Sequence, residues 1–197
     1  MVNITTNTLT PDKFIISPIP FWIRKQLHRP CWKFHLIIKA LFTPDKKEKI
    51  INEIKKVTGC SKIILYESGT SALYNLLRGC FGKKEVIMPS YCCKSVANAV
   101  IQAGLTPHFV DVEDDFMISA RTIKNAVNED TLAIIVPHMY NGKASVESIM
   151  HAFPEIVIIE DKANRAQDEL VAPYGILSFN IGKQIQSTGG GALLIKY

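Results

Sequence analysis

The chain has 197 residues, of which 47% are hydrophobic and 21% charged. This composition suffices for one sizeable folded domain and argues against a disordered chain. The formal net charge is +5, but residues 1–60 hold 11 basic against 4 acidic side chains, whereas residues 61–197 hold 12 against 14. A basic N-terminal segment followed by a near-neutral remainder is compatible with an acidic partner, a membrane surface or a solvated helix face.

Residues 1–45 form the predicted N-terminal arm, which is basic and aromatic. Within residues 14–42, aromatic side chains are interleaved with lysines and arginines. One interpretation is an arm that packs on its own domain or on a neighbouring subunit. Another is a peripheral membrane contact, because basic and aromatic side chains suit the headgroup layer. No recognised module accompanies this charge, so we expect no nucleic-acid partner.

The cysteines and the first residues of the chain give clues to the cellular compartment. The five cysteines are odd in number and lack CxxC spacing: Cys31, Cys60, Cys80, Cys92 and Cys93. Reduced thiols are therefore expected, as in a cytoplasmic protein. The first ten residues are polar and uncharged, so we expect no cleavable signal peptide, and the apolar runs are too short to span a bilayer. We predict a cytoplasmic protein, with membrane association through residues 14–42 as an open alternative, and no metal site.

A domain is predicted over residues 46–197, beginning with a helix over 46–59. Its isoleucines Ile50, Ile51 and Ile54 are expected to face inward, and Gly59 is expected to end it. Apolar runs with strand character follow at 62–67, 85–89, 107–112, 131–137, 155–161, 175–180 and 191–197. Helix-like stretches lie at 70–78, 94–103, 119–128 and 145–153. Apolar strands that alternate with helices predict an α/β fold of three layers, a mostly parallel sheet with helices on both faces.

Three stretches at predicted strand ends are candidate ligand sites, because open α/β sheets bind ligands there. The first is "ESGTSALYNLL". Its small residues Gly69, Thr70 and Ser71 open a helix, whose free backbone N–H groups and dipole favour an anion. A simple helix cap explains the same pattern, so this stretch alone does not decide between the two interpretations.

The second and third stretches each contain one reactive side chain. Asp161 ends a predicted strand, where a buried carboxylate needs a cationic partner such as a protonated cofactor nitrogen. Its alternative role is an N-cap. Lys183 follows Ser178 by five residues and precedes "STGGG". A lysine amine that loses its proton can form a Schiff base, and its alternative role is an ordinary solvated charge.

Five blocks taken in order resemble the DegT/DnrJ/EryC1/StrS aminotransferases over about residues 46–197. They are "SGTSAL", "EVIMPSYCCKSVANAVIQAGLTPHFVDV", "IVPHMYNGKASVESIM", "IIEDKANRAQ" and "LSFNIGKQIQSTGGGALL". The resemblance implies the large domain of fold type I, which binds pyridoxal 5'-phosphate. It further implies an aminotransferase that acts on an amino donor and a keto-sugar or similar keto substrate.

The resemblance also implies roles for individual residues. Lys183 would carry the internal aldimine and move the proton of the reaction, and Asp161 would pair with the pyridinium nitrogen. Thr70 and Ser71, at the helix start, and Ser178 would hold the phosphate. The implied cofactor-binding set is Gly69, Thr70, Ser71, Cys93, Asp161, Asn164, Ser178 and Lys183.

Some positions depart from the family's blocks. Cys93 stands where the family stacks an aromatic ring on the cofactor, and Asn164 stands where it has Gln or His. Lys162 and Arg165 replace small residues. His138 matches a histidine of the third block, to which we assign no role here.

Members of the family are much longer and continue into a small C-terminal domain. The sequence therefore predicts a split enzyme, in which a second polypeptide supplies the C-terminal half, in a hetero-oligomer and/or a homodimer. An alternative is a non-catalytic binding or scaffold relic of the fold that acts with a partner chain or a membrane surface. Other pyridoxal-phosphate enzymes, such as sugar dehydratases, and a fragment studied in isolation are further interpretations.

Overall fold

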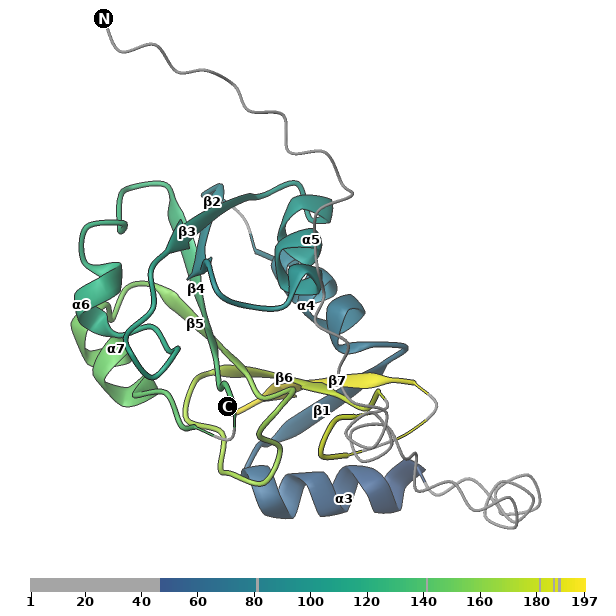
Figure 1. Cartoon of the computed structure of the whole chain (residues 1–197). Helices are drawn as coiled ribbons and strands as arrows, with labels where there is room; N and C mark the ends of the chain where they lie inside the picture. Colours follow the sequence, from purple (N-terminus) through teal and green to yellow (C-terminus); the bar gives the residue numbers. More distant parts are fainter. Residues whose placement is uncertain (1–46, 81, 141, 181, 186, 188) are drawn as a thin grey trace, which may run out of the picture. The chain divides into compact units, whose positions relative to one another are not determined.

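The computed structural model describes residues 47–80, 82–140, 142–180, 182–185, 187 and 189–197. The predictions for the N-terminal arm and for Cys31 lie outside these residues. In the described part, seven strands form one sheet in the order β1-β7-β6-β5-β4-β2-β3 (Figure 1). The strands are β1 (Lys62–Tyr66), β2 (Glu85–Pro89), β3 (Thr106–Val110), β4 (Thr131–Pro137), β5 (Val157–Asp161), β6 (Tyr174–Ser178) and β7 (Gly191–Ile195).

The middle of the sheet is parallel. Strand β4 pairs in parallel with β2 and β5, and β6 continues the parallel set. Only β7 among the described strands runs the other way, between β6 and β1. All seven residues of β4 are buried, as expected for an apolar strand covered on both faces. The carboxyl ends of the other six strands therefore share one edge of the sheet.

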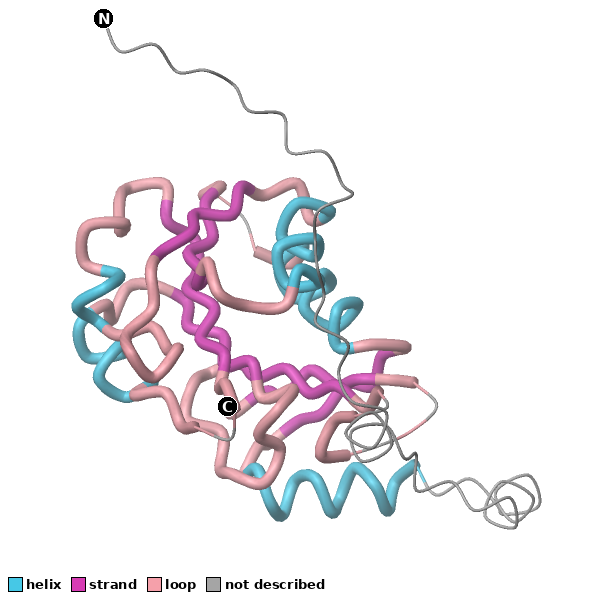
Figure 2. The backbone as a smooth tube through the Cα atoms, in the orientation of Figure 1, coloured by secondary structure: helices cyan, strands magenta, loops and turns pink. Residues whose placement is uncertain are grey.

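Helices cover both faces of this sheet (Figure 2). The helices are α3 (Lys47–Thr58), α4 (Gly69–Arg78), α5 (Lys94–Gln102), α6 (Ala120–Ile123) and α7 (Val146–Ala152). Helices α4 and α5 pack on one face, where Leu77 and Val100 join Ile135 of β4 in one core. On the opposite face, α6 and α7 pack on β4 and β5, and α3 packs on β1, β6 and β7. The predicted three-layer α/β fold is confirmed.

Two details of the helix predictions are wrong. The helix expected over 119–128 is only the four residues of α6. The Ser119 hydroxyl caps its start, and the N–H of Ala126 bonds to the carbonyl of Ile123, three residues back, which tightens the chain and ends the helix.

The second error is Ile50, which was expected to face inward but is 51% exposed. The stripe of α3 that faces the sheet runs through Ile51, Ile54 and Thr58, at spacings of three and four residues. Ile50 therefore falls to one side, where it lines an open apolar groove with Val57. The predicted end of the helix is confirmed, since Gly59 has a φ of 65° and donates to the carbonyl of Lys55.

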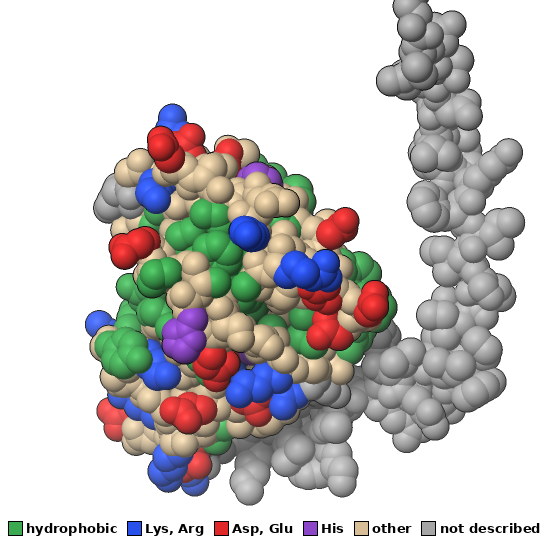
Figure 3. All heavy atoms as spheres, turned by 90° about the vertical axis from the view of Figure 1, so that its left-hand side faces the viewer, with side chains coloured by type: hydrophobic (Ala, Val, Ile, Leu, Met, Phe, Trp, Pro, Cys, Tyr) green, Lys and Arg blue, Asp and Glu red, His purple; other side chains and the backbone are tan. Residues whose placement is uncertain are grey.

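The surface of the described part shows no block of one charge on the face drawn in Figure 3. Acidic and basic side chains are interspersed there with hydrophobic ones. None of the described helices is long and apolar enough to cross a membrane. The residues that the structure describes also contain no group of three or more His, Cys, Asp or Glu side chains placed to hold a metal ion.

Candidate active site

A cavity of about 350 Å³ lies at the carboxyl edge of the sheet. Loops that follow β1, β2, β4, β5 and β6 all contribute to its wall. Its lining residues are Gly69, Thr70, Leu73, Cys92, Cys93, Ser95, Val96, Pro137, Met139, Asp161, Ala163, Asn164, Ile176, Ser178, Asn180 and Lys183. The position agrees with the rule that open α/β sheets bind ligands beyond the carboxyl ends of their strands.

The structure brings seven of the eight predicted site residues to this cavity: Gly69, Thr70, Cys93, Asp161, Asn164, Ser178 and Lys183. Ser71 is the exception, because it is occupied within the start of α4. Its N–H donates to Oγ of Ser68 over 3.0 Å, and its own hydroxyl donates to Oε1 of Glu67 over 3.2 Å. The side chain of Ser71 therefore takes part in the helix cap and does not line the cavity.

The first turn of α4 faces the end of β6. A Cβ atom at Gly69 would come within 3.0 Å of the Leu177 carbonyl oxygen and 3.2 Å of Cβ of Ser178. A side chain here would force these neighbours to shift, so glycine favours this close approach, and Thr70 and Ser178 lie on the same cavity wall. The first N–H groups of any α-helix have no partner within the helix. At the N-terminus of α4 the Ser71 N–H is capped by Ser68, so the N–H groups of Gly69 and Thr70 are the donors left beside two hydroxyl side chains.

Asp161 is the last residue of β5. Its Oδ1 atom accepts a hydrogen bond from the N–H of Ala163 over 2.9 Å. Its second oxygen, Oδ2, makes no hydrogen bond with any residue that the structure describes. Burial raises the pKa of the Asp161 carboxyl, while the Ala163 N–H and the Lys183 charge oppose that rise. A carboxylate with one spare oxygen in a cavity suits a cationic N–H donor.

Lys183 lies in the turn after β6, where its N–H donates to the carbonyl of Asn180. Its Nζ atom donates to Oδ1 of Asn164 over 2.8 Å, so the amine is held by a neutral acceptor at the cavity wall. A second lysine, Lys162, is close in sequence but is fully buried elsewhere. Among the described lysines, only Lys183 lines the cavity.

The glycines after Lys183 allow β7 to approach the start of α4. A Cβ atom at Gly191 would lie 2.3 Å from the backbone nitrogen of Gly69 and 2.4 Å from the carbonyl carbon of Ser68. Ser68 also forms a bridge with Gly190, whose φ is 112°. These contacts fix the loop before α4 against the strand that follows Lys183.

Two adjacent thiols in the wall differ in chemistry. The Sγ atom of Cys93 accepts a hydrogen bond from the Ser95 hydroxyl over 3.0 Å, and this bond lowers the pKa of the Cys93 thiol. Burial and the nearby Asp161 charge raise the pKa of Cys92 to about 11. Cys93, which is exposed, is thus the more acidic of the pair.

Sequence reasoning did not include Ser95 and Asn180, two polar residues of the cavity wall. Asn180 follows Ser178 by two residues and so falls on the same side of an extended segment, which is a signal that could have found it. Ser95 lies in the first turn of α5, and nothing in its local sequence distinguishes it from a capping serine.

An exposed aromatic cluster lies on the same edge of the sheet. The rings of Tyr91, Phe116 and Tyr140 have centroids 5.3–6.3 Å apart and come from loops after β2, β3 and β4. Phe116 and Tyr140 have φ angles of 65° and 47°, which are unusual for bulky residues. Tyr91 and Tyr140 are next in sequence to cavity residues, Cys92 and Met139. The edge therefore presents aromatic surface near the cavity.

The sheet order and the helix layers are those of the large domain of fold type I aminotransferases. Residues 40–196 match the model of the DegT/DnrJ/EryC1/StrS aminotransferase family. The chain belongs to this family, and the resemblance seen in the sequence is confirmed.

The chain is similar to several aminotransferases over part of their length. The chain is 30% identical over 155 residues to UDP-N-acetyl-3-dehydro-alpha-D-glucosamine 3-aminotransferase of Acidithiobacillus ferrooxidans, covering 73% of this chain and 42% of the relative. Its fold is similar to PseC of Helicobacter pylori, an aminotransferase of pseudaminic acid biosynthesis, with a TM-score of 0.77 at 21% identity, covering 87% and 52% of the two chains. NtdA of Bacillus subtilis with bound PMP gives a TM-score of 0.71 at 25% identity, covering 79% and 38%. The chain thus spans about half the length of these proteins or less.

Proposed function

We propose that this chain is the cofactor-binding part of a pyridoxal-phosphate-dependent aminotransferase that acts on a keto-sugar. One observation carries the proposal: the Lys183 amine, the spare oxygen of Asp161 and the N-terminus of α4 line one cavity. The names of the relatives support the reaction and the substrate class, and the PMP in NtdA supports the cofactor.

The residues of the cavity fit such a cofactor. Oδ2 of Asp161 would accept the N–H of the protonated pyridine ring, since it has no partner among the described residues. The first amides of α4, with the hydroxyls of Thr70 and Ser178, would hold the phosphate. Asn164 would face the ring hydroxyl. Ser71 remains a predicted phosphate ligand that would have to turn from its capping contact with Glu67.

When bound, the cofactor supplies an electron sink that stabilises the carbanion at the reacting carbon. The chain's own residues do the rest. Asp161, as an anion, keeps the proton on the ring nitrogen, and the Lys183 amine gives and takes the proton at the substrate carbon. Asn164 holds that amine over the cavity through its Oδ1 atom until the cofactor binds.

The rest of the substrate site and the assembly are also proposals. The chain spans 42% of its relative from A. ferrooxidans, so an amino donor and a keto substrate would meet groups beyond the described residues. We propose an oligomer, either a homodimer or a pair with a second polypeptide. Residues 1–45 as a separate arm, its peripheral membrane contact and a cytoplasmic location remain predictions. Light scattering on the chain, alone and with a candidate partner, would test the assembly.

The cofactor proposal is tested by reductive trapping. The full chain is mixed with pyridoxal phosphate, reduced with borohydride, digested and mapped by mass spectrometry. We expect a phosphopyridoxyl group on Lys183 and its loss in Lys183→Ala, with Lys196→Ala as the matched control that keeps it. An adduct on a different lysine, or none in the complete assembly, contradicts the proposal and favours the non-catalytic relic of the fold.

A further inference from the structure

Two hydrogen bonds join the turn that holds Lys183 to the loop after β5. In the first, Nζ of Lys183 donates to Oδ1 of Asn164 over 2.8 Å. In the second, the N–H of Ala166 donates to Oε1 of Gln184 over 2.7 Å. Two neighbouring residues of one segment are therefore bonded to two residues of the other segment that lie two positions apart. The proposed reaction gives Gln184 no role.

The two hydrogen bonds lie on different sides of the chain. Lys183 and Asn164 line the cavity. Gln184 and Ala166 instead line the open apolar groove beside α3, whose volume is about 570 Å³. Ile185, the next residue, packs against the apolar cluster beneath α3. Gln184 is not a cavity residue, so it acts on a ligand there through its neighbour Lys183.

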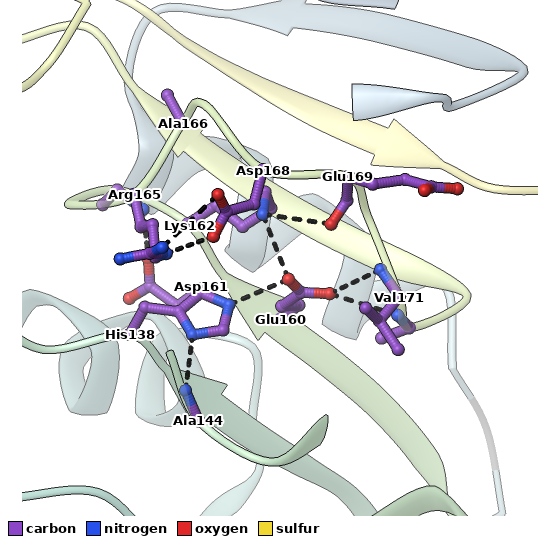
Figure 4. A network of polar contacts seen from close by, with 12 residues as sticks. His138, Ala144, Glu160, Asp161, Lys162, Arg165, Ala166, Asp168, Glu169 and Val171 are labelled. Carbon is purple, nitrogen blue, oxygen red and sulfur yellow. Dashed lines mark hydrogen bonds and ion pairs between the residues drawn. The ribbon is translucent and has the colours of Figure 1, made fainter. Parts of the chain in front are cut away.

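The loop after β5 is a firm support for this contact. Figure 4 shows the loop with Glu160 and Val171 at its two ends. Oε2 of Glu160 accepts from the N–H groups of Val171 over 2.9 Å and Ala172 over 3.1 Å, which ties the two ends together. Oε1 is bonded to Nε2 of His138 over 2.8 Å and to Nζ of Lys162 over 3.1 Å. Burial alone would raise the pKa of Glu160, but these hydrogen bonds and the Lys162 charge lower it to about 2. The base of the loop is thus fixed by a buried, fully bonded anion.

The hydrogen bond between Ala166 and Gln184 is needed on both of its sides. Ala166 is only 8% exposed, and its N–H makes no other hydrogen bond in the part of the chain that the structure describes. A buried N–H without an acceptor is destabilising. On the other side, Gly182 has a φ of 88°, and a Cβ built there would meet no described atom within 4 Å. Packing at Gly182 therefore does not hold the turn before Lys183.

The first of the two hydrogen bonds is lost when the Lys183 amine reacts with an aldehyde. The neutral amine nitrogen forms a double bond to the aldehyde carbon, and the carbonyl oxygen leaves as water with the two protons of the nitrogen. Nζ then has no proton to donate to Asn164. Of these two hydrogen bonds, only that between Ala166 and Gln184 can persist through the reaction.

We propose that Gln184 is a positioning residue for Lys183: by accepting the Ala166 N–H, it holds the Lys183 turn against the loop after β5, before and after the amine reacts. The contact lies outside the cavity, so it leaves the amine free to move while its backbone stays in place. The reaction of the amine rests on the proposed function, whereas the fixing of the turn does not.

The first test is the rate at which Lys183 reacts with pyridoxal phosphate, measured on the full chain by stopped-flow absorbance. Gln184→Met removes the acceptor at similar length, and Gln184→Glu keeps an acceptor. Gln167→Met is the matched control, because Gln167 is also exposed and lines the same groove. Each variant is compared at the pH of its maximal rate, which removes effects on the protonation of the amine. We expect a rate lower by about tenfold or more in Gln184→Met alone, because misplacing a reacting group is costly.

The affinity for a cofactor analogue that cannot react separates positioning from a general disturbance of the cavity. The probe is 4-deoxypyridoxine 5'-phosphate, which has the ring and the phosphate but no aldehyde. Its Kd should be the same in the wild type and in all three variants. An unchanged rate in Gln184→Met overturns the proposal. A loss of probe affinity as large as the loss of rate also overturns it, because the substitution would then have damaged the whole site.

Amide hydrogen exchange tests the fixing of the turn without any cofactor. In the full chain, followed by NMR, Gln184→Met should speed exchange at the N–H groups of both Ala166 and Lys183 by about tenfold or more, since both would open more often. Gln184→Glu and Gln167→Met should leave both rates near those of the wild type. Faster exchange at Ala166 alone would mean that Gln184 only caps the loop after β5, which overturns the proposal. If the wild type does not react with pyridoxal phosphate, the proposed function fails, while the exchange rates still decide the role of Gln184.

Discussion

Lys183 and Asn164, from the loops after β6 and β5, are joined by a hydrogen bond of 2.8 Å between Nζ and Oδ1. The acceptor is a neutral amide, although the carboxylate of Asp161 lies three residues earlier on the same cavity wall. A neutral acceptor orients the amine without adding to the forces that keep it protonated. This matters because only the unprotonated amine is a nucleophile.

Asn164→Asp should therefore slow the reaction of Lys183 with pyridoxal phosphate. A carboxylate at the same distance stabilises the protonated, non-nucleophilic amine, and we expect the rate of adduct formation at pH 8 to fall about tenfold or more. Stopped-flow absorbance gives the rate. Asn98→Asp, an exposed position on α5 outside the cavity, is the control. An equal rate in both variants would show that the amide does not set the reactivity of Lys183.

Asp161→Asn should stabilise the chain without cofactor and weaken cofactor binding. Burial raises the pKa of Asp161 above its unfolded value, near 3.9, so ionisation costs folding free energy as the pH rises from the unfolded to the folded pKa. Asparagine avoids this cost at pH 7 and keeps an acceptor for the Ala163 N–H. We expect a higher Tm without pyridoxal phosphate and turnover lower by orders of magnitude with it.

The control for this measurement is Asp168→Asn. The hydrogen bond from Arg165 lowers the pKa of Asp168, so its ionised form contributes to stability and the sign is reversed. Its Tm should not rise. A Tm of Asp161→Asn at or below that of the wild type at pH 7 would mean that ionisation of the buried Asp161 carboxyl does not lower the folding stability.

The fold followed from local patterns because strands such as 131–137 and helices such as 70–78 have apolar periods that match their burial. The errors arose where tertiary contacts decide the orientation of a side chain or the end of a helix. Ile50 has the spacing of an inward residue, but the position of α3 on the sheet turns it to one side. The polar residues after Ile123 allow a longer helix, but the turn that leads to β4 ends it.

The sequence predicted which loops form the site, because the carboxyl ends of parallel strands share one edge of the sheet. It was not predictable which side chains point inward from each loop. Ser71 has the residue type of a phosphate ligand but is bonded to the capping residue Ser68 and to Glu67, whereas Ser95 was not singled out and lines the cavity. The buried pair of Glu160 and Lys162 was likewise hidden, because a charged residue after a strand usually lies in water.

Gly191→Ala should destabilise the chain by at least about 2 kcal/mol, because the added methyl group would overlap backbone atoms of Ser68 and Gly69. A loss of that size lowers the Tm of a domain of this length by about 4–8 °C. Gly189→Ala is the matched control, since its Cβ would meet nothing closer than 3.9 Å. Thermal unfolding of both variants by circular dichroism measures the difference, and equal Tm values would refute the close approach of β7 to α4.

Acid should remove the contribution of Glu160 to stability. Its pKa of about 2 lies below the unfolded value near 4.3, so the contribution is complete above pH 4.3 and is lost as the pH falls toward 2. The charge-free variant Glu160→Gln/Lys162→Met should lose less stability over this range than the wild type. Urea unfolding at pH 5 and pH 3 gives the two slopes. A steeper loss in the double variant would contradict the assignment of Glu160 as the acid-sensitive group.

Cys93→Phe should strengthen the binding of pyridoxal phosphate. Cys93 lies in the cavity wall, at the position for which the family resemblance implies an aromatic ring on the cofactor, and its side chain is exposed, so a larger group has room. A stacked ring contributes about 1 kcal/mol, which is roughly a fivefold lower Kd. The neighbour Cys92 is partly buried, and Cys92→Phe should instead disturb the wall, so it serves as the matched control. Kd values come from absorbance titration at one pH. If Cys93→Phe binds the cofactor no more tightly than the wild type while keeping its Tm, residue 93 does not lie against the face of the bound ring.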